Sequence, residues 1–422
     1  MRFTTFLRVT LFTSLITSLA FSAHAPLEPA SARAASSPKK PPASAQRSLR
    51  ESNTTFALKA FREVTRKTTD NVMFSPISLT IALGMVYAGA RGGTAAQMAH
   101  AMNLTLRKQD VHRALGWLSH DLTARPKTSQ EAVAFKMANA LWPDKRRRFS
   151  DAYLNTLSVN YGANPKPLDF AGDPKGARET INGWVSDQTE RRIPELLPEG
   201  LIGPNTSLVL TNAVYFNASW KTPFSKMATR FEYFYPLKGK KRTSPLMSRT
   251  ATYKHMAGEG FEAVELDYSG DRLSMLAIVP ERGRYQEIAA RLDSKLLAEV
   301  MGGLTKRKLK LFIPRFTFES AFNLVGEMRA LRMRDAFDGS KADLSGMNGA
   351  RDLHVDQIIQ KTFVQVDERG TEAAAATVVT TRGKSRRPPE PILKIDRPFV
   401  FLIRDKPTGT ILFIGRMAEP TE

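Results

Sequence analysis

The sequence of 422 residues contains no cysteine, and this absence excludes several kinds of chemistry at once. Without thiols the chain cannot form a disulfide, a thiolate nucleophile or a cysteine metal site. It also lacks a long apolar run, because no stretch reaches the roughly 20 residues that a membrane-spanning helix needs. The fold must therefore be stabilised by its apolar core.

Motifs of the common enzyme classes are missing as well. The chain has no Gly-x-Ser-x-Gly elbow, His-Glu-x-x-His helix, phosphate loop or dinucleotide fingerprint. Its histidines show no tight spacing of metal ligands, and surface or core positions are the better interpretation of them: His24, His100, His112, His120, His255 and His354. We therefore expect neither an enzyme nor a metal site.

Hydrophobic residues make up 42% of the chain, which is enough for a large core, and the formal net charge is +21. The amino terminus has a basic start, a short apolar stretch and the small-residue pattern Ala23-His24-Ala25. This arrangement predicts a secretory signal peptide over residues 1–25. Because Pro26 directly follows Ala25, the signal peptidase could instead cut after Ala20 or Ala32. We expect the protein to be secreted, either to the extracellular space or to the periplasm.

Residues 26–48 are rich in Pro, Ala, Ser and Lys and are expected to form a flexible linker. From Leu49 onward apolar residues recur at helical spacing, and no second linker follows, so residues 49–422 are predicted to form a single domain. Helices are expected over 77–90, 93–103, 108–123, 150–160, 174–191 and 284–301. Strands are expected over 207–218, 309–319, 361–368 and a hairpin of 399–404 with 410–416. A mixed α and β fold is therefore expected.

One segment near the carboxyl terminus combines small side chains with an alternating pattern. From Gly370 to Gly383 there is no proline, and nothing bulky occurs in the first half. One alternating face is uncharged and of modest size, whereas Glu372 and Arg382 lie on the other. As a new strand in a sheet, the segment could bury the first face without burying a charge, which would cost several kcal/mol. The uncharged face consists of Thr371, Ala373, Ala375, Thr377, Val379, Thr381 and Gly383.

Four segments together resemble the serpin family in residue type and order. They are residues 71–94, 210–224, 366–377 and 397–420, and the likeness extends from about Leu49 to the end. The resemblance implies an α+β serpin fold with three β-sheets, about nine helices and an exposed reactive loop near the carboxyl terminus. It also implies an irreversible suicide-type inhibitor of serine proteases, in which the cleaved loop inserts into the main sheet as a strand.

The resemblance assigns the reactive bond and the hinge of this loop. The family's spacing from Glu368 leads to Lys384, with Ser385 after the cut; counting back from Pro398 favours Arg387, and Arg382 and Arg386 are further alternatives. A Lys or Arg at the cut bond indicates a trypsin-like target with an acidic specificity pocket. The hinge comprises Glu368, Arg369, Gly370, Thr371, Glu372, Ala373, Ala374, Ala375 and Ala376.

Further positions carried over by the resemblance lie along the opening of the main sheet. Ser75, Ser78 and Asn212 match a polar cluster, and Trp220 matches the aromatic residue where the loop enters. Glu368 and Arg315 match an ion pair at the origin of the loop. Gln360 stands where the family often has a histidine, so opening should persist while its pH response changes.

Two questions remain open at this point. Basic clusters at Lys145–Arg148, Lys238–Arg242 and Lys306–Lys310 could bind a polyanion such as a heparin-like glycan, an acidic lipid surface or nucleic acid, or could simply be solvated charge. The chain could also be a non-inhibitory serpin-fold binding protein or a polyanion-binding surface protein. We expect a monomer without a cofactor, whose partner is a serine protease.

Overall fold

The computed structural model describes residues 38–123, 133–371 and 390–421. The expected signal peptide, residues 1–25, and most of the expected linker lie outside these ranges. The last residues of the expected linker, 43–48, are helical, because helix α1 begins at Ala43 and runs to Arg66. Its buried side chains begin at Leu49, so the first turns carry no apolar signal that a sequence could reveal.

The helices that follow α1 pack largely around α2. Ser75 caps α2, since its Oγ accepts a hydrogen bond from the Ser78 amide at 3.3 Å, and Pro76 occupies the first helical position. Every residue of α2 except Ala88 is buried, so this helix lies inside the core. The helices of this part are α2 (Pro76–Gly89), α3 (Gly92–Ala101), α4 (Lys108–Thr123), α5 (Asp151–Tyr161) and α6 (Pro174–Gln188).

The helix expected over 284–301 is two helices. Asp293 interrupts it, because its Oδ1 accepts hydrogen bonds from the amides of Lys295 and Leu296, both at 2.9 Å, and so caps a new helix. The remaining helices are α7 (Tyr285–Arg291), α8 (Ser294–Gly303), α9 (Val325–Ala330) and α10 (Ser345–Asn348), with 3-10 turns η1 (Lys226–Ala228) and η2 (Asp335–Phe337). No helix within the described ranges is long and apolar enough to span a membrane.

A five-stranded sheet runs beneath α6 in the order β2-β3-β11-β10-β9. Its strands are β2 (Val133–Pro143), β3 (Leu208–Ser219), β11 (Gly370–Thr371), β10 (Gln357–Val366) and β9 (Phe316–Asn323). Strands β3 and β10 also pair directly, in parallel, from Gln357 opposite Val209 to Phe363 opposite Tyr215. We call this parallel ladder the β3–β10 seam.

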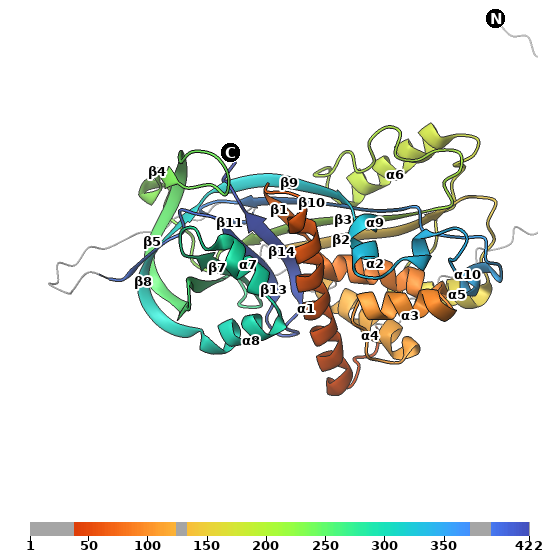
Figure 1. Ribbon diagram of the computed structural model, residues 1–422, viewed down its shortest axis with the longest axis horizontal. Helices are drawn as coiled ribbons and strands as arrows, with labels where there is room; N and C mark the ends of the chain where they lie inside the picture. Colours follow the sequence, from red (N-terminus) through yellow and green to blue (C-terminus); the bar gives the residue numbers. More distant parts are fainter. Residues whose placement is uncertain (1–37, 124–132, 372–389, 422) are drawn as a thin grey trace, which may run out of the picture. The chain divides into compact units, whose positions relative to one another are not determined.

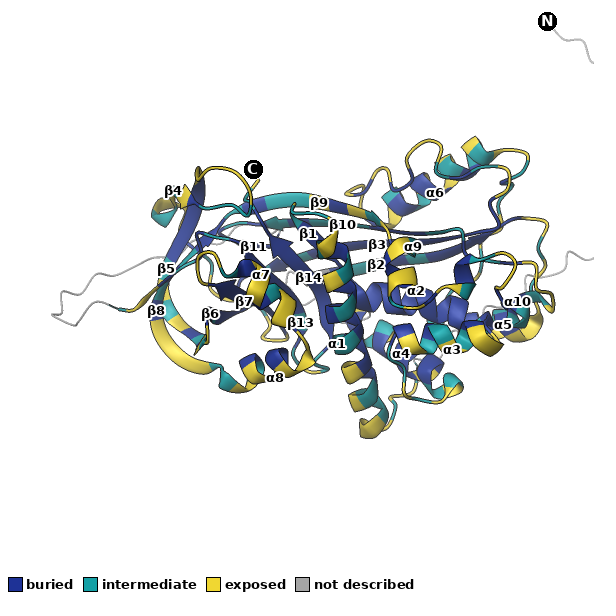
Figure 2. Ribbon diagram, viewed as in Figure 1, coloured by how far each residue is buried: buried dark blue, intermediate teal, exposed yellow. Residues whose placement is uncertain are grey.

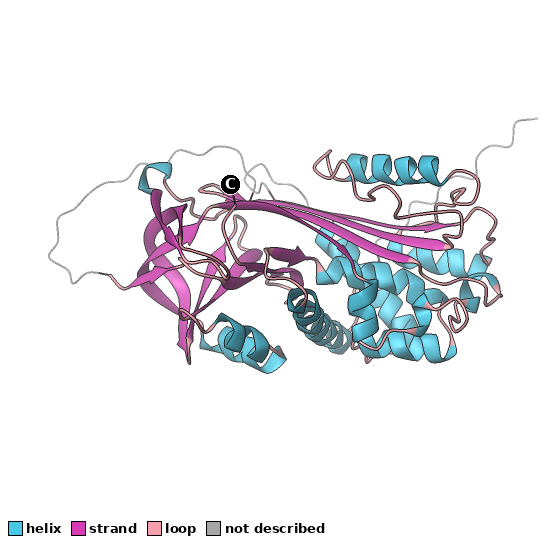
Figure 3. Cartoon of the chain, turned by 45° about the horizontal axis from the view of Figure 1, so that its top comes forward, coloured by secondary structure: helices cyan, strands magenta, loops and turns pink. Residues whose placement is uncertain are grey.

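The two faces of the five-stranded sheet belong to different cores. Leu208, Leu210 and Val214 of β3 join the main core, whereas Val209 and Ala213 join a smaller cluster with Ile181 and Val185 of α6. Helix α6 lies alone on one face of the sheet, and most helices lie on the other (Figures 1 and 3). Because strand side chains alternate, a residue's parity decides which core it enters.

The second sheet has nine strands in the described residues, in the order β1-β14-β13-β7-β6-β5-β8-β12 with β4 on β5. Strand β5 is 17 residues long and pairs with β4, β6 and β8, which keeps these strands in one sheet. The described strands therefore form two hydrogen-bonded sheets, whereas three were expected. The α+β class is confirmed, as is the carboxyl-terminal hairpin. The strands are β1 (Val72–Phe74), β4 (Arg230–Phe234), β5 (Arg242–Gly258), β6 (Phe261–Asp267), β7 (Leu273–Pro280), β8 (Thr305–Pro314), β12 (Ile392–Lys394), β13 (Phe399–Asp405) and β14 (Ile411–Met417).

The strand expected over 309–319 is also two elements. Strand β8 ends at Pro314 in the nine-stranded sheet, and β9 begins at Phe316 in the five-stranded sheet. Proline has no amide hydrogen to continue a ladder, so the chain changes sheets there. The described residues hold ten α-helices against about nine expected, and the shortest, α10, has four residues.

Candidate functional site

A tight turn connects β10 to β11 at one end of the seam. After Val366 the chain reverses, and the Asp367 amide donates to the Gly370 carbonyl at 2.9 Å. Asp367 Oδ1 accepts hydrogen bonds from the amides of Arg369 (2.8 Å) and Gly370 (3.2 Å). An aspartate that bonds its own following backbone in this way stabilises a turn.

Gly370 occupies a place where no other residue fits. A Cβ at this position would lie 2.2 Å from the Ala218 carbonyl oxygen and 2.6 Å from the Ser219 Cα. Both are backbone atoms of β3, so neither can move aside without disturbing the sheet. Glycine therefore lets the chain enter between β3 and β10 immediately after the turn.

Trp220 and Phe224 hold the turn from the end of β3. Trp220 Nε1 donates to the Asp367 carbonyl at 2.9 Å, and the Trp220 amide donates to the Arg369 carbonyl at 2.8 Å. The Phe224 amide donates to the Glu368 carbonyl at 2.7 Å. These bonds leave the three carbonyls of the turn satisfied without any contact to the residues beyond Thr371.

Thr371 shows which face of the loop points inward. It is fully buried, and its hydroxyl shares a 2.9 Å hydrogen bond with the Tyr268 hydroxyl. The Tyr268 ring stacks on Trp220, with centroids 4.6 Å apart and an interplanar angle of 9°. Burial raises the pKa of Tyr268, so its hydroxyl stays protonated. No local sequence pattern pointed to Tyr268, which lies just after β6 and far from the loop in sequence.

The ion pair expected between Glu368 and Arg315 stays a prediction. Glu368 is buried, and its Oε1 accepts a 2.6 Å hydrogen bond from the Thr229 hydroxyl. The Arg315 amide donates to the Pro245 carbonyl at 2.9 Å. Glu368 therefore fixes the turn through a neutral donor on the segment that enters β4.

A polar cluster crosses the seam itself. Gln360 of β10 and Asn212 of β3 lie opposite each other, and Gln360 Nε2 donates to Asn212 Oδ1. Gln360 also binds the backbone of Ser75, accepting from its amide at 2.8 Å and donating to its carbonyl at 3.1 Å. All three residues are fully buried. The side-chain bond ties the two strands together between their backbone bonds.

The same cluster continues to α2 and β2. Asn212 Nδ2 donates to Ser78 Oγ at 2.7 Å and to Asn139 Oδ1. Ser78 Oγ in turn donates to Asn139 Oδ1 at 3.0 Å, and Asn139 lies opposite Asn212 in the β2–β3 ladder. Sequence reasoning missed Asn139, although the register of β2 against β3 would have placed it here.

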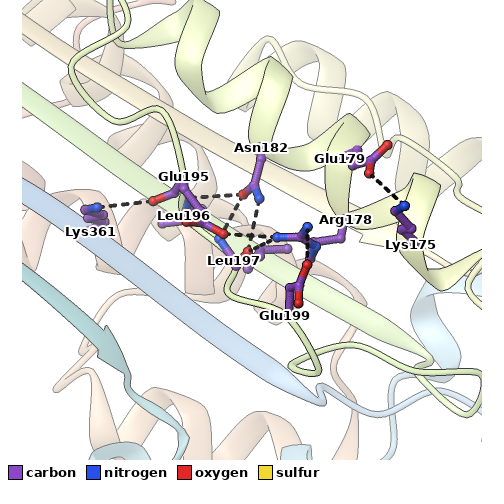
Figure 4. A network of polar contacts seen from close by, with 9 residues as sticks. All are labelled: Lys175, Arg178, Glu179, Asn182, Glu195, Leu196, Leu197, Glu199 and Lys361. Carbon is purple, nitrogen blue, oxygen red and sulfur yellow. Dashed lines mark hydrogen bonds and ion pairs between the residues drawn. The ribbon is translucent and has the colours of Figure 1, made fainter.

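Helix α6 and the segment after it cover the seam from the outside, as Figure 4 shows. Asn182 Oδ1 accepts from the amides of Leu196 (3.0 Å) and Leu197 (2.8 Å), and its Nδ2 donates to the Leu197 carbonyl at 3.0 Å. Lys361 of β10 donates to the Glu195 carbonyl at 3.2 Å. This segment, residues 195–197, thus links α6 to one edge of the seam.

The structure brings Ser75, Ser78, Asn212 and Gln360 together at the middle of the seam, and Trp220, Glu368, Arg369, Gly370 and Thr371 at its hinge end. The rest of the expected hinge, residues 372–376, lies outside the described residues, as do Lys384, Ser385, Arg382, Arg386 and Arg387. Within the described part of the chain, no group of three or more His, Asp or Glu side chains comes together that could hold a metal ion.

Comparison with known proteins agrees with this geometry. Residues 51–420 match the family described as serpin (serine protease inhibitor). The horse (Equus caballus) leukocyte elastase inhibitor is 36% identical over 382 residues, covering 88% of this chain and 99% of that protein. Mouse (Mus musculus) antithrombin-III is 34% identical over 88% of this chain and 82% of its own length. Human thyroxine-binding globulin in complex with its ligand has a TM-score of 0.81 and 26% identity, over 90% of this chain and all of that one.

Proposed function

The chain belongs to the serpin family, and we propose that it is an exported, single-use inhibitor of trypsin-like serine proteases. In this proposal a protease attacks the reactive bond and forms an acyl-enzyme with the residue before the cut. The freed loop then enters the β3–β10 seam as a new strand before the acyl-enzyme is hydrolysed. Distortion of the attached protease traps it permanently.

The observation that carries the proposal is the position of Gly370 and Thr371. They already lie between β3 and β10, antiparallel to both strands: Thr371 is opposite Ala218 on one side and Val366 on the other. The first step of insertion therefore needs no new register. The loop has only to continue in the direction in which it already runs.

Extending that register fixes where each loop residue would go. Thr377 would come opposite Asn212 on β3 and Gln360 on β10, in the middle of the polar cluster. It would share the inward face of Thr371, as would Ala373 and Ala375, while Glu372 would point outward. The alternation of uncharged side chains in the sequence thus agrees with the face that the structure buries at Thr371.

Insertion would exchange one ladder for two. The parallel seam of seven residue pairs would open, and the new strand would pair with β3 and β10 in antiparallel fashion. About ten added ladder hydrogen bonds at roughly 1 kcal/mol net each would favour the inserted state by something like 10 kcal/mol. The intact chain would then be kinetically trapped.

Specificity and location rest on the sequence. A Lys or Arg stands at each alternative for the cut bond, Lys384 first and Arg382, Arg386 or Arg387 after it, and a basic residue fits the acidic pocket of trypsin-like enzymes. The signal-like residues 1–25 support export to an extracellular or periplasmic space.

Incubation with trypsin tests the proposal. We expect a complex that survives boiling on a denaturing gel, and mass analysis of the released fragment identifies the cut bond. Lys384→Ala should abolish the complex if Lys384 is used, and Arg387→Ala serves as its matched alternative.

A non-inhibitory protein would behave differently. It would be cleaved without a stable complex, and the nicked chain would unfold at the temperature of the intact one. Cleavage that raises the unfolding temperature without any complex would retain insertion but reject trypsin as a suitable target.

A further inference from the structure

The three basic clusters of the sequence differ in how far the fold neutralises them. In the first, Lys145 pairs with Asp169 at 2.7 Å, Arg146 with Asp144 at 2.6 Å, and Arg147 with Asp352. Three of its four charges are therefore balanced locally. In the cluster on β8, only Lys308 pairs with a described acid, Glu390 at 2.6 Å, so charge balance alone does not separate this cluster from the third one.

The cluster between β4 and β5 is mostly unbalanced. Arg242 pairs with Glu419 at 2.7 Å, but Lys238, Lys240 and Lys241 are exposed and form no ion pair with any described residue. These residues belong to a protruding hairpin, residues 226–242, which we call the β4 hairpin. Figure 2 shows the loop between β4 and β5 as exposed. The β4 hairpin has one acid, Glu232, against six basic residues: Lys226, Arg230, Lys238, Lys240, Lys241 and Arg242.

The same hairpin carries an unusual share of exposed apolar surface. Five large hydrophobic side chains are exposed in the described part of the protein, and three of them fall within seven residues here. Met227 is 85% exposed, Phe231 69% and Tyr233 51%. Single exposed apolar residues are ordinary, but a group of them beside unpaired charge indicates a binding surface.

The strand geometry places apolar and basic groups together. Phe231 and Tyr233 are two positions apart on β4, so they share one face, and Lys241 Nζ lies 3.8 Å from the centre of the Tyr233 ring. Glu232 points to the opposite face, where it pairs with Lys394 at 3.0 Å. Phe234 on that face is buried and anchors the strand.

From this arrangement we propose that the β4 hairpin binds an anionic phospholipid surface. Met227, Phe231 and Tyr233 enter the boundary between headgroups and acyl chains, and the three lysines contact the headgroup charges. Aromatic side chains favour this boundary, and basic residues next to it are attracted by an anionic leaflet. Binding is peripheral, since the hairpin supplies a few side chains and not a spanning segment.

A lipid surface explains more of the hairpin than a soluble polyanion does. A sulfated glycan or nucleic acid would contact the lysines, but it would leave Met227 and Phe231 in water. A partner with an apolar layer beneath its charges uses both kinds of group. The two partners therefore differ in how they respond to loss of the apolar side chains alone.

The test is vesicle sedimentation with the full chain. We expect binding to vesicles of phosphatidylcholine and phosphatidylglycerol and none to pure phosphatidylcholine. The variant Met227→Ser/Phe231→Ser/Tyr233→Ser keeps every charge and should weaken binding at least tenfold, while its retention on immobilised heparin stays unchanged. Lys238→Gln/Lys240→Gln/Lys241→Gln should weaken vesicle binding to a similar extent.

A matched control removes three charges elsewhere. The three residues of Arg47→Gln/Lys295→Gln/Arg334→Gln lie on α1, on α8 and just before η2, are exposed, and form no ion pair with any described residue, so this variant should change vesicle binding less than twofold. Equal losses in the control and in the lysine variant would overturn the site, because net charge alone would then drive binding. Unchanged vesicle binding by the serine variant would overturn the lipid assignment in favour of a soluble polyanion.

Tryptophan fluorescence provides a second test that does not rely on weakened binding. In Phe231→Trp the added tryptophan should shift its emission to shorter wavelength on anionic vesicles, relative to the wild-type chain. An unshifted spectrum in the presence of bound vesicles would contradict insertion of the hairpin. Neither experiment uses a protease, so a failed inhibition assay would leave this proposal standing.

Discussion

The hinge end of the β3–β10 seam and its middle are built in opposite ways. At the hinge end, Gly370 and Thr371 already separate the strands, and Trp220 binds the turn through backbone carbonyls. In the middle, Gln360 and Asn212 bond directly across the seam, and residues 195–197 hold α6 over it. In the proposed insertion, opening therefore has a direction: it starts where the loop has entered, and the polar cluster resists it.

The largest effect is expected from Gly370→Val, a change at the hinge end of the seam. The new side chain would meet the Ala218 carbonyl, where even a Cβ would lie at 2.2 Å, and would push Thr371 out of the sheet. We expect the rate of complex formation with the target protease to fall at least tenfold, with cleaved inhibitor as the main product. The measurement is the ratio of complex to cleaved chain on a denaturing gel.

Gly302→Val is the matched control, because a Cβ at Gly302 meets nothing within 4 Å. It should leave the ratio of complex to cleaved chain unchanged. Normal inhibition by Gly370→Val would show that entry at the hinge does not depend on this close approach.

The next largest effect is expected from Asn212→Ala, a change in the polar cluster at the middle of the seam. It removes the bonds to Gln360, Ser78 and Asn139 and leaves buried polar groups without partners. The free energy of unfolding should fall by about 3 kcal/mol, and spontaneous loss of inhibitory activity on warming should accelerate. Denaturant unfolding and residual activity after incubation measure the two effects.

Thr211→Val provides the comparison within the same strand. Thr211 is also buried and accepts a 2.8 Å hydrogen bond from Trp142 Nε1, but on the side facing α6. The Thr211→Val variant should have a lower free energy of unfolding but should not lose inhibitory activity faster on warming. If both variants inactivate equally fast, the cluster has no special control over the seam.

A smaller effect is expected from Asn182→Ala, which loosens the cover. Loss of the bonds to Leu196 and Leu197 should lower the free energy of unfolding by roughly 2 kcal/mol and expose the amides of these residues to hydrogen exchange. Glu179→Ala on the same helix is the control, since Glu179 is exposed and pairs only with Lys175 in Figure 4. If the Leu196 and Leu197 amides stay protected from hydrogen exchange in Asn182→Ala, the Asn182 side chain does not hold this segment.

The smallest effect is a pH dependence of the free energy of unfolding that comes from His112 and not from the seam. The polar cluster contains no titratable side chain, whereas burial, and then the charge of Lys108, lower the pKa of His112 to about 4. Between that value and an unfolded pKa of about 6.5, the unfolded chain binds one more proton, so stability falls as the pH falls. From about pH 7.5 to about pH 5.5 the loss should be about 1 kcal/mol.

Denaturant unfolding at the two pH values measures this loss, and His112→Gln should remove it. The rate of inactivation on warming should not change through the polar cluster over the same range. A steep pH dependence of that rate in His112→Gln would point to a titrating group in the seam.

The sequence predicted the elements that carry strong periodicity and the residues that a family pattern fixes. The positions of α2 and β3, and the hairpin of β13 with β14, follow from apolar spacing and turn residues. The meeting of Gln360 with Asn212 could be anticipated only through the family resemblance, because 148 residues separate them.

What escaped prediction depends on contacts between distant segments. Asn139 in β2 and Tyr268 just after β6 belong to the site only because the sheets bring them there, and neither has a local signal. The hydrogen bond from Thr229 to Glu368 likewise depends on tertiary packing. Asp293 and Pro314 are typical residues for a helix start and a strand end, because one can cap a helix and the other lacks an amide hydrogen. The apolar pattern continues across both positions, so it predicted one helix and one strand where the structure has two of each.

The most direct test of the account is a structure of the chain after cleavage in its reactive loop. We expect a new strand between β3 and β10 in the register set by Thr371, with Thr377 between Asn212 and Gln360. A cleaved chain in which Asn212 still lies opposite Gln360 would contradict the claim that the seam opens from its hinge end to receive the loop.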